Sequence, residues 1–168
     1  MYKENDYLVY KKDVCKVREV RKNKMNGKDY YILIPINDES LIIEAPADNR
    51  MGFIRDVISK EDAENLIKKI PEIESLENID DKYIEKTYKE LLYNGNLEDL
   101  IKIIKTTYLR NDARIKSNKK ISDKDKTYFE KAEEYLYNEL SISLGMSFVD
   151  TKNYIIDKVN ELIKCSHY

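Results

Sequence analysis

The sequence has 168 residues, of which 42% are hydrophobic, and a formal net charge of -2, which is typical of a soluble globular protein. No apolar run approaches the ~18 residues of a membrane-spanning helix and no hydrophobic signal region follows Met1, so we expect a cytoplasmic protein. The two cysteines, Cys15 and Cys165, lie far apart without Cys-x-x-Cys spacing, so they indicate neither a disulfide framework nor a structural zinc site.

The first third of the chain has the pattern of a small β-sheet. Residues 7–10 alternate weakly and predict a first strand, and residues 14–46 predict a three-stranded meander rich in Val, Tyr and Ile. Within the meander, Asn26-Gly27 predicts a type I′ turn, and the polar residues 37–40 predict a second turn. Residues 52–55 add a closing strand, so we expect a strongly bent antiparallel sheet of about five strands.

A helical pattern begins at residue 59. Ser59 and Asp62 have the spacing of a capping box, and Pro71 ends the helix that follows. Residues 72–81 then carry five carboxylates and neither lysine nor arginine, which suggests a solvated linker.

Four more helices are expected after this acidic segment. The first spans about 81–94 and ends at Gly95, and the second follows it; a polar, basic loop at 111–120 precedes the last two, at 122–144 and 147–164. Their apolar stripes are far more typical of a bundle core than of a ligand site, so the fold class is α+β: a sheet module followed by an all-α bundle of about four to five helices. The side chains expected to face this core are Ala63, Leu66, Ile67, Ile70, Leu97, Leu100, Ile101, Ile104, Tyr108, Tyr128, Ala132, Tyr135, Leu136, Leu140, Ile155, Ile156, Val159, Leu162 and Ile163.

The near-zero net charge conceals a basic segment. Residues 101–126 contain nine lysines and arginines against three aspartates, a local excess of six charges. Such a run is usually a solvated surface, but it also supplies the sequence-independent attraction that phosphates require.

Catalytic patterns are absent from the sequence. His167 is the only histidine and lies next to the C-terminus, and no carboxylates have metal-ligand spacing. Turns and helix ends account for all four glycines, which leaves none for a phosphate-binding loop. Cys15 has lysines near it, but a strand cysteine is usually a small core residue. We therefore expect a protein that is not an enzyme and uses no metal or cofactor.

Short motifs along nearly the whole chain add a family likeness. Residues 5–10 (Asn-Asp-Tyr-Leu-Val-Tyr) are similar to an opening G-D-x-V-V-Y, and residues 54–59 (Ile-Arg-Asp-Val-Ile-Ser) to a passage hydrophobic-R-x-V-hydrophobic-S. Residues 93–109 and 121–140 are similar to a "sGd" turn with its following helix, and to a helix of the form "lS…E-K…A…L…E-L". In this order and spacing, the motifs resemble those of the CarD-like transcription regulators, which are related to the polymerase-interacting domain of the transcription-repair coupling factor.

The resemblance implies a non-enzymatic regulator of bacterial transcription initiation. It implies a Tudor-like, RNA polymerase-interacting domain at 1–58, a connecting helix at 59–71, the acidic linker at 72–81, and a helical DNA-contacting domain at 82–168. The partners implied are the polymerase β subunit and promoter DNA, contacted in the minor groove and backbone at the upstream edge of the bubble, so that the open complex is stabilised. The polymerase-facing residues expected are Arg21, Asn23, Ile43 and Glu44, and we expect the strand at 41–45 to stay open as an edge for strand addition to this partner. The DNA-facing residues expected are Lys82, Tyr83, Lys86, Lys116, Lys119, Lys120, Lys124 and Lys126.

One departure from the family affects the DNA contact. The family inserts a tryptophan wedge about fourteen residues before the "sGd" glycine, but this chain has no tryptophan, and that spacing falls on Asp81. The nearest aromatic residue is Tyr83, which either replaces the wedge or packs in the bundle core.

A protein-protein adaptor is the alternative function. In that case the same two modules bind polymerase or another partner without DNA, in keeping with the acidic pI of about 5.7. An enzyme of unrecognised type is a distant third.

Overall fold

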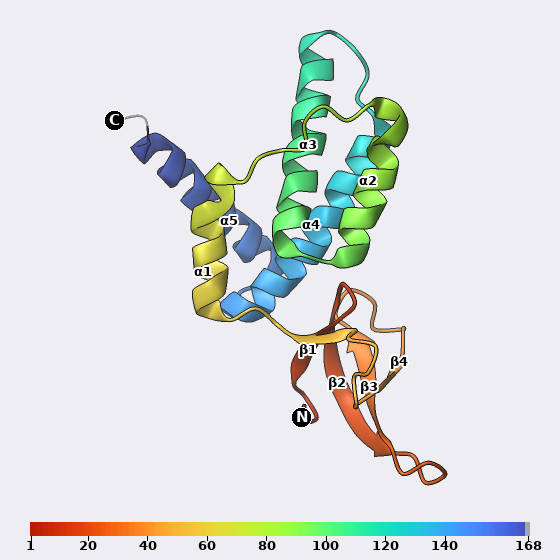
Figure 1. Ribbon diagram of the computed structural model, residues 1–168. Helices are drawn as coiled ribbons and strands as arrows, with labels where there is room; N and C mark the ends of the chain where they lie inside the picture. The colour runs from red at the N-terminus through yellow and green to blue at the C-terminus, as the bar shows by residue number, and fades with distance from the viewer. Residues whose placement is uncertain (167–168) are drawn as a thin grey trace. The chain divides into compact units, whose positions relative to one another are not determined.

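The computed structural model describes residues 1–166 and divides the chain into two compact units, Met1–Ile58 and Ser59–Tyr168. Within the described residues, five strands are followed by five α-helices and one short 3-10 helix, as Figure 1 shows. The predicted α+β class, with a sheet module before a helical module, is confirmed.

The first unit is a single antiparallel sheet with the strand order β4-β3-β2-β1-β5. Because neighbouring residues of a strand face opposite sides, directly paired residues such as Leu8 and Cys15, or Val17 and Leu33, lie on one face. That face forms the apolar core of the unit. The strands are β1 (Tyr7–Tyr10), β2 (Asp13–Lys22), β3 (Asp29–Pro35), β4 (Ile43–Pro46) and β5 (Ile54–Asp56).

The sheet is bent, and a bulge contributes to the bend. The β2–β3 register shifts between Val17 and Glu19, which inserts one extra residue and increases the local twist. As a result, Tyr10 of β1 and Ala45 of β4 line the same pocket although two strands separate β1 from β4.

The β2–β3 turn differs from the predicted type I′ turn. Only Gly27 has a positive φ (67°), whereas type I′ requires a positive φ at Asn26 as well. The loop is longer than two residues: Asn23 N–H donates to the Lys28 carbonyl at 2.8 Å, and the Asn23 and Asn26 side chains accept from Met25 N–H and Lys28 N–H. These side-chain bonds to the backbone stabilise the wider loop.

The second predicted turn is confirmed. The Asp38 carboxylate accepts hydrogen bonds from both the backbone N–H and the hydroxyl of Ser40, and these bonds lower the pKa of Asp38.

Several helix ends lie where local signals predicted them. The Ser59, Ser122 and Ser147 side chains accept hydrogen bonds from the N–H three residues later, and Gly95 ends a helix with the expected left-handed conformation (φ 64°). The helices are α1 (Lys60–Lys69), the 3-10 helix η1 (Ile70–Glu72), α2 (Asp81–Asn94), α3 (Leu97–Lys116), α4 (Asp123–Leu144) and α5 (Phe148–Cys165).

The segments predicted to connect two domains lie inside the helical unit. Helix α1 packs against α4 and α5. The acidic segment after η1 keeps its carboxylates exposed, but its backbone is fixed to α3: Leu76 N–H donates to the Thr106 hydroxyl at 2.8 Å, and the Lys105 ammonium donates to the Ile70 and Ile73 carbonyls. The carboxylate pattern indicated solvation correctly, but it carried no information about these backbone bonds.

Three details of the helical pattern are corrected by the structure. Helix α3 continues to Lys116, so residues 111–116 of the loop predicted at 111–120 are helical. Tyr108, expected in the core, is 61% exposed, and Ile103 is fully buried instead, because α3 packs against both α2 and α4. On α5, Ile155 is buried but Ile156 and Ile163 are exposed, because this helix packs against α1, α4 and η1 on one side.

Candidate functional site

The predicted polymerase-facing residues lie on both faces of the sheet edge. Arg21 of β2 reaches across β3 to Glu44 of β4, at 3.5 Å, and also bonds Glu19, whose pKa it lowers. Arg21, Asn23 and Glu44 line one shallow pocket of about 310 Å³. Ile43 does not join them, because it pairs with the buried Leu33 and packs against the core on the opposite face.

Strand β4 forms one edge of the sheet. Within the described residues it pairs with β3 on one side and ends the strand order, as predicted for an edge strand, but it spans Ile43–Pro46 and not 41–45; strand addition to a partner stays a prediction. The strand itself begins at Ile43, and the exposed Leu41 and Ile42 precede it. An unpaired edge offers backbone N–H and C=O groups to an added strand.

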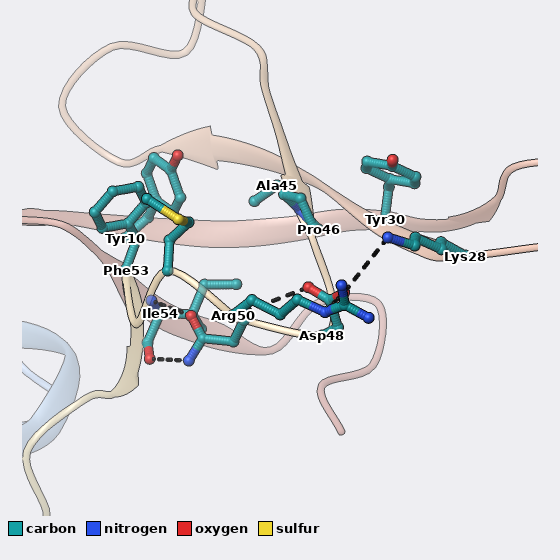
Figure 2. Close-up of a pocket in the computed structure, with 11 residues that line it drawn as sticks. Tyr10, Lys28, Tyr30, Ala45, Pro46, Asp48, Arg50, Phe53 and Ile54 are labelled. Carbon is teal, nitrogen blue, oxygen red and sulfur yellow. Dashed lines mark hydrogen bonds and ion pairs between the residues drawn. The ribbon is translucent and has the colours of Figure 1, made fainter. Parts of the chain in front are cut away.

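A second pocket, of about 310 Å³, lies between β1, β3, β4 and residues 47–53. At one end, the rings of Tyr10 and Phe53 meet edge to face at 6.0 Å, and the Lys11 ammonium lies 4.8 Å from the Phe53 ring centroid. At the other end, Asp48 forms ion pairs with Arg50 (3.0 Å) and Lys28 (4.0 Å), as Figure 2 shows.

Sequence reasoning did not find this pocket. Its wall depends on Asn49, whose side chain accepts from Ile54 N–H at 2.9 Å and donates to the Ile54 carbonyl at 2.8 Å, which fixes the segment after β4. The aromatic residues Tyr10 and Phe53 were a signal, but only the bend of the sheet brings them opposite β4.

In the helical unit, the start of α2, the end of α3 and the start of α4 converge, and Figure 1 shows these three ends together. Arg110 of α3 joins them: its Nη2 lies 2.8 Å from Asp81 of α2, and its Nε lies 3.0 Å from Asp125 of α4. Asp125 is fully buried and also accepts a hydrogen bond of 2.9 Å from the Tyr88 hydroxyl. Burial, followed by this bond, raises the pKa of Tyr88, so the phenol stays protonated. We call the surface formed by residues 81–86, 110–120 and 122–126 the basic end.

Most of the predicted DNA-facing lysines have acidic partners. Lys119 and Lys120 are exposed after the end of α3, and neither side chain forms an ion pair with any residue of the described part of the chain. Lys82 lies beside the Tyr83 ring, and the pairing of the other four lysines reduces the positive field that the sequence suggested. The observed pairs are Lys86–Glu90 (4.0 Å), Lys116–Asp112 (2.7 Å), Lys124–Glu85 (3.5 Å) and Lys126–Glu130 (4.0 Å).

Tyr83 lies on the surface of the first turn of α2. Its side chain is 55% exposed, and the Lys82 ammonium lies 5.5 Å from its ring centroid. The buried tyrosine of this helix is Tyr88. The alternative that Tyr83 packs in the bundle core is therefore wrong, and its role as a wedge stays a prediction.

Among residues 1–166, no group of three or more His, Cys, Asp or Glu side chains could hold a metal ion. Cys15 is buried, and burial raises the pKa of its thiol to about 12, so the reactive thiolate is not formed near neutral pH. His167 lies outside the described residues. No helix in the described part of the chain has the length and apolar character to cross a membrane.

Comparison with known proteins gives no assignment. No protein-family model matches the sequence, and a search of curated proteins finds no match either. The likeness to the CarD-like regulators thus depends on the short motifs and their order along the chain.

Proposed function

We propose that this protein is a non-enzymatic bacterial transcription regulator that binds the RNA polymerase β subunit through its sheet unit and promoter DNA through the basic end. The family likeness motivates both partners. The observation that carries the proposal is that the two units present different surfaces. The sheet unit presents an open sheet edge, and the helical unit presents an exposed aromatic ring and two lysines that have no carboxylate partner within residues 1–166.

The sheet unit supports recognition of a protein segment. An added strand at β4 obtains affinity from backbone hydrogen bonds, and neighbouring pockets give specificity for its side chains. Two pockets border β4: the charged one that contains Arg21 and Glu44, and the aromatic one that contains Tyr10 and Phe53.

The basic end supports a weak, sequence-independent DNA contact. Lys119 and Lys120 supply phosphate attraction, and Tyr83 supplies a ring that can stack beside an opened base step. Weak binding suffices because attachment to polymerase raises the effective concentration of the basic end near the promoter.

A charge swap tests the polymerase contact. Arg21→Glu and Glu44→Arg should each weaken binding of the full-length protein to purified polymerase, but each also breaks the Arg21–Glu44 pair. The double variant restores this pair with its signs exchanged. If polymerase contacts the two charged side chains directly, its binding stays weak in the double variant. Recovery of wild-type affinity would show that the pair only stabilises the sheet and does not contact polymerase.

The DNA contact is tested by Lys119→Ala/Lys120→Ala. For each lysine that binds a phosphate in the wild type, its removal should flatten the log-log salt dependence of binding to polymerase-promoter complexes by ~0.9. The matched control is Lys68→Ala/Lys69→Ala, which removes two adjacent exposed lysines from α1. Equal slopes for wild type and both double variants would contradict the DNA contact.

Open-complex lifetime tests the wedge. Tyr83→Ala should shorten the lifetime and Tyr83→Trp should preserve or extend it, because a larger ring offsets more of the unstacking cost. Tyr93→Ala is the control, since Tyr93 is also exposed on α2 but lies in its last turn. A folded Tyr83→Ala protein that matches the wild-type lifetime would exclude the wedge.

The adaptor alternative is favoured by one observation, the extensive ion pairing of the predicted DNA-facing lysines. An adaptor would bind polymerase with the same charge-swap behaviour but show no salt-dependent retention on DNA.

A further inference from the structure

The carboxylate of Asp81 occupies a place where positive charges gather. Its side chain is 72% exposed, yet it accepts an ion-pair contact of 2.8 Å from Arg110. The hydrogen bond from Arg110 lowers the pKa of Asp81. Arg114 lies one helical turn after Arg110 on α3, and Lys124 of α4 pairs at 3.5 Å with Glu85, which lies one turn after Asp81 on α2. Three cations from the end of α3 and the start of α4 therefore lie on the same side of the bundle as this surface carboxylate.

The Arg110 guanidinium, which donates to this carboxylate, is also held on its buried side. Asp125, whose side chain is 1% exposed, accepts from Arg110 Nε at 3.0 Å, and the Tyr88 hydroxyl holds the other oxygen of Asp125 at 2.9 Å. With Nε held by this buried pair, Nη2 is directed to the surface before any ligand arrives. A guanidinium held in this way binds an oxyanion with little further loss of side-chain freedom.

The local charge balance shows what Asp81 contributes. Asp125 offsets Arg110, and Glu85 lies 3.5 Å from Lys124, so these two cations have acidic partners other than Asp81. Arg114 forms no ion pair within residues 1–166. Asp81 is thus the charge whose removal leaves the cluster with an excess of cations, and, being exposed, its own ion pair costs little to exchange.

We propose that Arg110, Arg114 and Lys124 form a binding site for a phosphate oxyanion, and that Asp81 occupies this site until a phosphate displaces it. Arginine binds carboxylate and phosphate oxygens through the same charge-assisted geometry, so one group replaces the other without rebuilding the site. The site deepens the proposed function by naming a backbone phosphate contact at the basic end, and in that respect it depends on the proposed function. Asp81 then weakens DNA binding in the isolated protein.

The experiment compares Asp81→Asn with Asp123→Asn in the full-length protein. Asp123 is the matched control because it is also the exposed first residue of its helix, α4, but it has no ion pair with Arg110. Binding of a fluorescein-labelled mixed-sequence duplex is followed by anisotropy over a salt series. We expect Asp81→Asn to bind about fivefold more tightly than wild type at low salt, with a salt slope steeper by ~0.9. Adding Arg114→Gln to Asp81→Asn should remove this gain.

A second arm uses inorganic phosphate in place of the duplex, with binding followed by the NMR signals of the Arg114 and Arg110 side chains. A gain specific to Asp81→Asn in the duplex arm assigns a phosphodiester, and a gain in the phosphate arm alone assigns a free phosphate; either supports the site. Equal gains for Asp81→Asn and Asp123→Asn, or no gain for folded Asp81→Asn in both arms, overturn it.

Failure of the site and failure of the proposed function give different results. If Asp81→Asn shows no gain while the Lys119/Lys120 variant still loses salt-dependent promoter binding, the site is excluded and the proposed function stands. If Asp81→Asn gains phosphate or duplex affinity but wild type binds no polymerase, the site stands and the proposed function is excluded.

Discussion

The two units are stabilised by different kinds of core. The sheet unit encloses an apolar cluster that includes Leu8, Val17 and Leu33. The helical unit contains every buried polar or charged side chain found in the described part of the chain. These residues are Thr106, Thr107, Asp125, Glu139, Ser141 and Thr151.

The difference explains how each unit positions its surface. Apolar contacts are not directional, so the sheet core determines which side chains are buried but does not determine the conformation of the loops around the sheet. Turns and side-chain hydrogen bonds determine that conformation. A buried ion pair tolerates few geometries, because an unpaired buried charge is costly. The Arg110–Asp125 pair therefore sets how the ends of α3 and α4 meet at the basic end.

The largest expected effect comes from Asp125→Ala. The substitution leaves the partly buried Arg110 without its inner partner and the buried Tyr88 hydroxyl without an acceptor, so we expect a loss of about 4 kcal/mol of stability. Hydrogen exchange with mass spectrometry should show faster exchange in α2, α3 and α4 and unchanged exchange in β2 and β3. Asp123→Ala, two residues earlier and exposed, is the control. Equal effects of the two substitutions would contradict a structural role for the buried pair.

A smaller effect, of about 3 kcal/mol, is expected for Leu33→Ala. Leu33 is fully buried in the sheet core, and its truncation leaves a cavity. Exchange should now rise in β2 and β3, while α2 to α4 keep their protection. Leu41→Ala removes the same atoms from an exposed side chain and should be nearly neutral. If Leu33→Ala accelerates exchange equally in both units, they do not unfold separately and the comparison between them fails.

The smallest effect concerns pH. Because the Arg110 hydrogen bond lowers the pKa of Asp81 in the folded state, its stabilisation is complete above the unfolded aspartate value of about 3.9 and is lost as the pH falls through the lower folded value. Wild type should therefore exceed Asp81→Asn slightly in Tm near neutral pH, and the two should converge in strong acid. Added salt should also reduce the difference, since Asp81 is exposed. A difference that persists in strong acid would show that it does not arise from this carboxylate.

The sequence alone determined the order of strands and helices and several of the helix ends. Ser59, Ser122 and Ser147 cap helices through bonds to residues three positions away, and Gly95 ends α2 through its own backbone conformation. These interactions are local, so residues close in sequence suffice to predict them. Residues 7–10 were likewise predicted as a strand with the bounds that the structure shows for β1.

Tertiary structure decided which surfaces these elements form. The bend of the sheet brings Tyr10 opposite Ala45, and the packing of three helix ends joins Arg110 to Asp81 and Asp125, which lie 29 and 15 positions away in the sequence. Helical periodicity placed Tyr108 in the core because it records where apolar residues recur, but burial depends on where neighbouring helices lie. For the same reason the sequence showed an excess of lysines and arginines, while only the folded chain decided which of them have a carboxylate within reach.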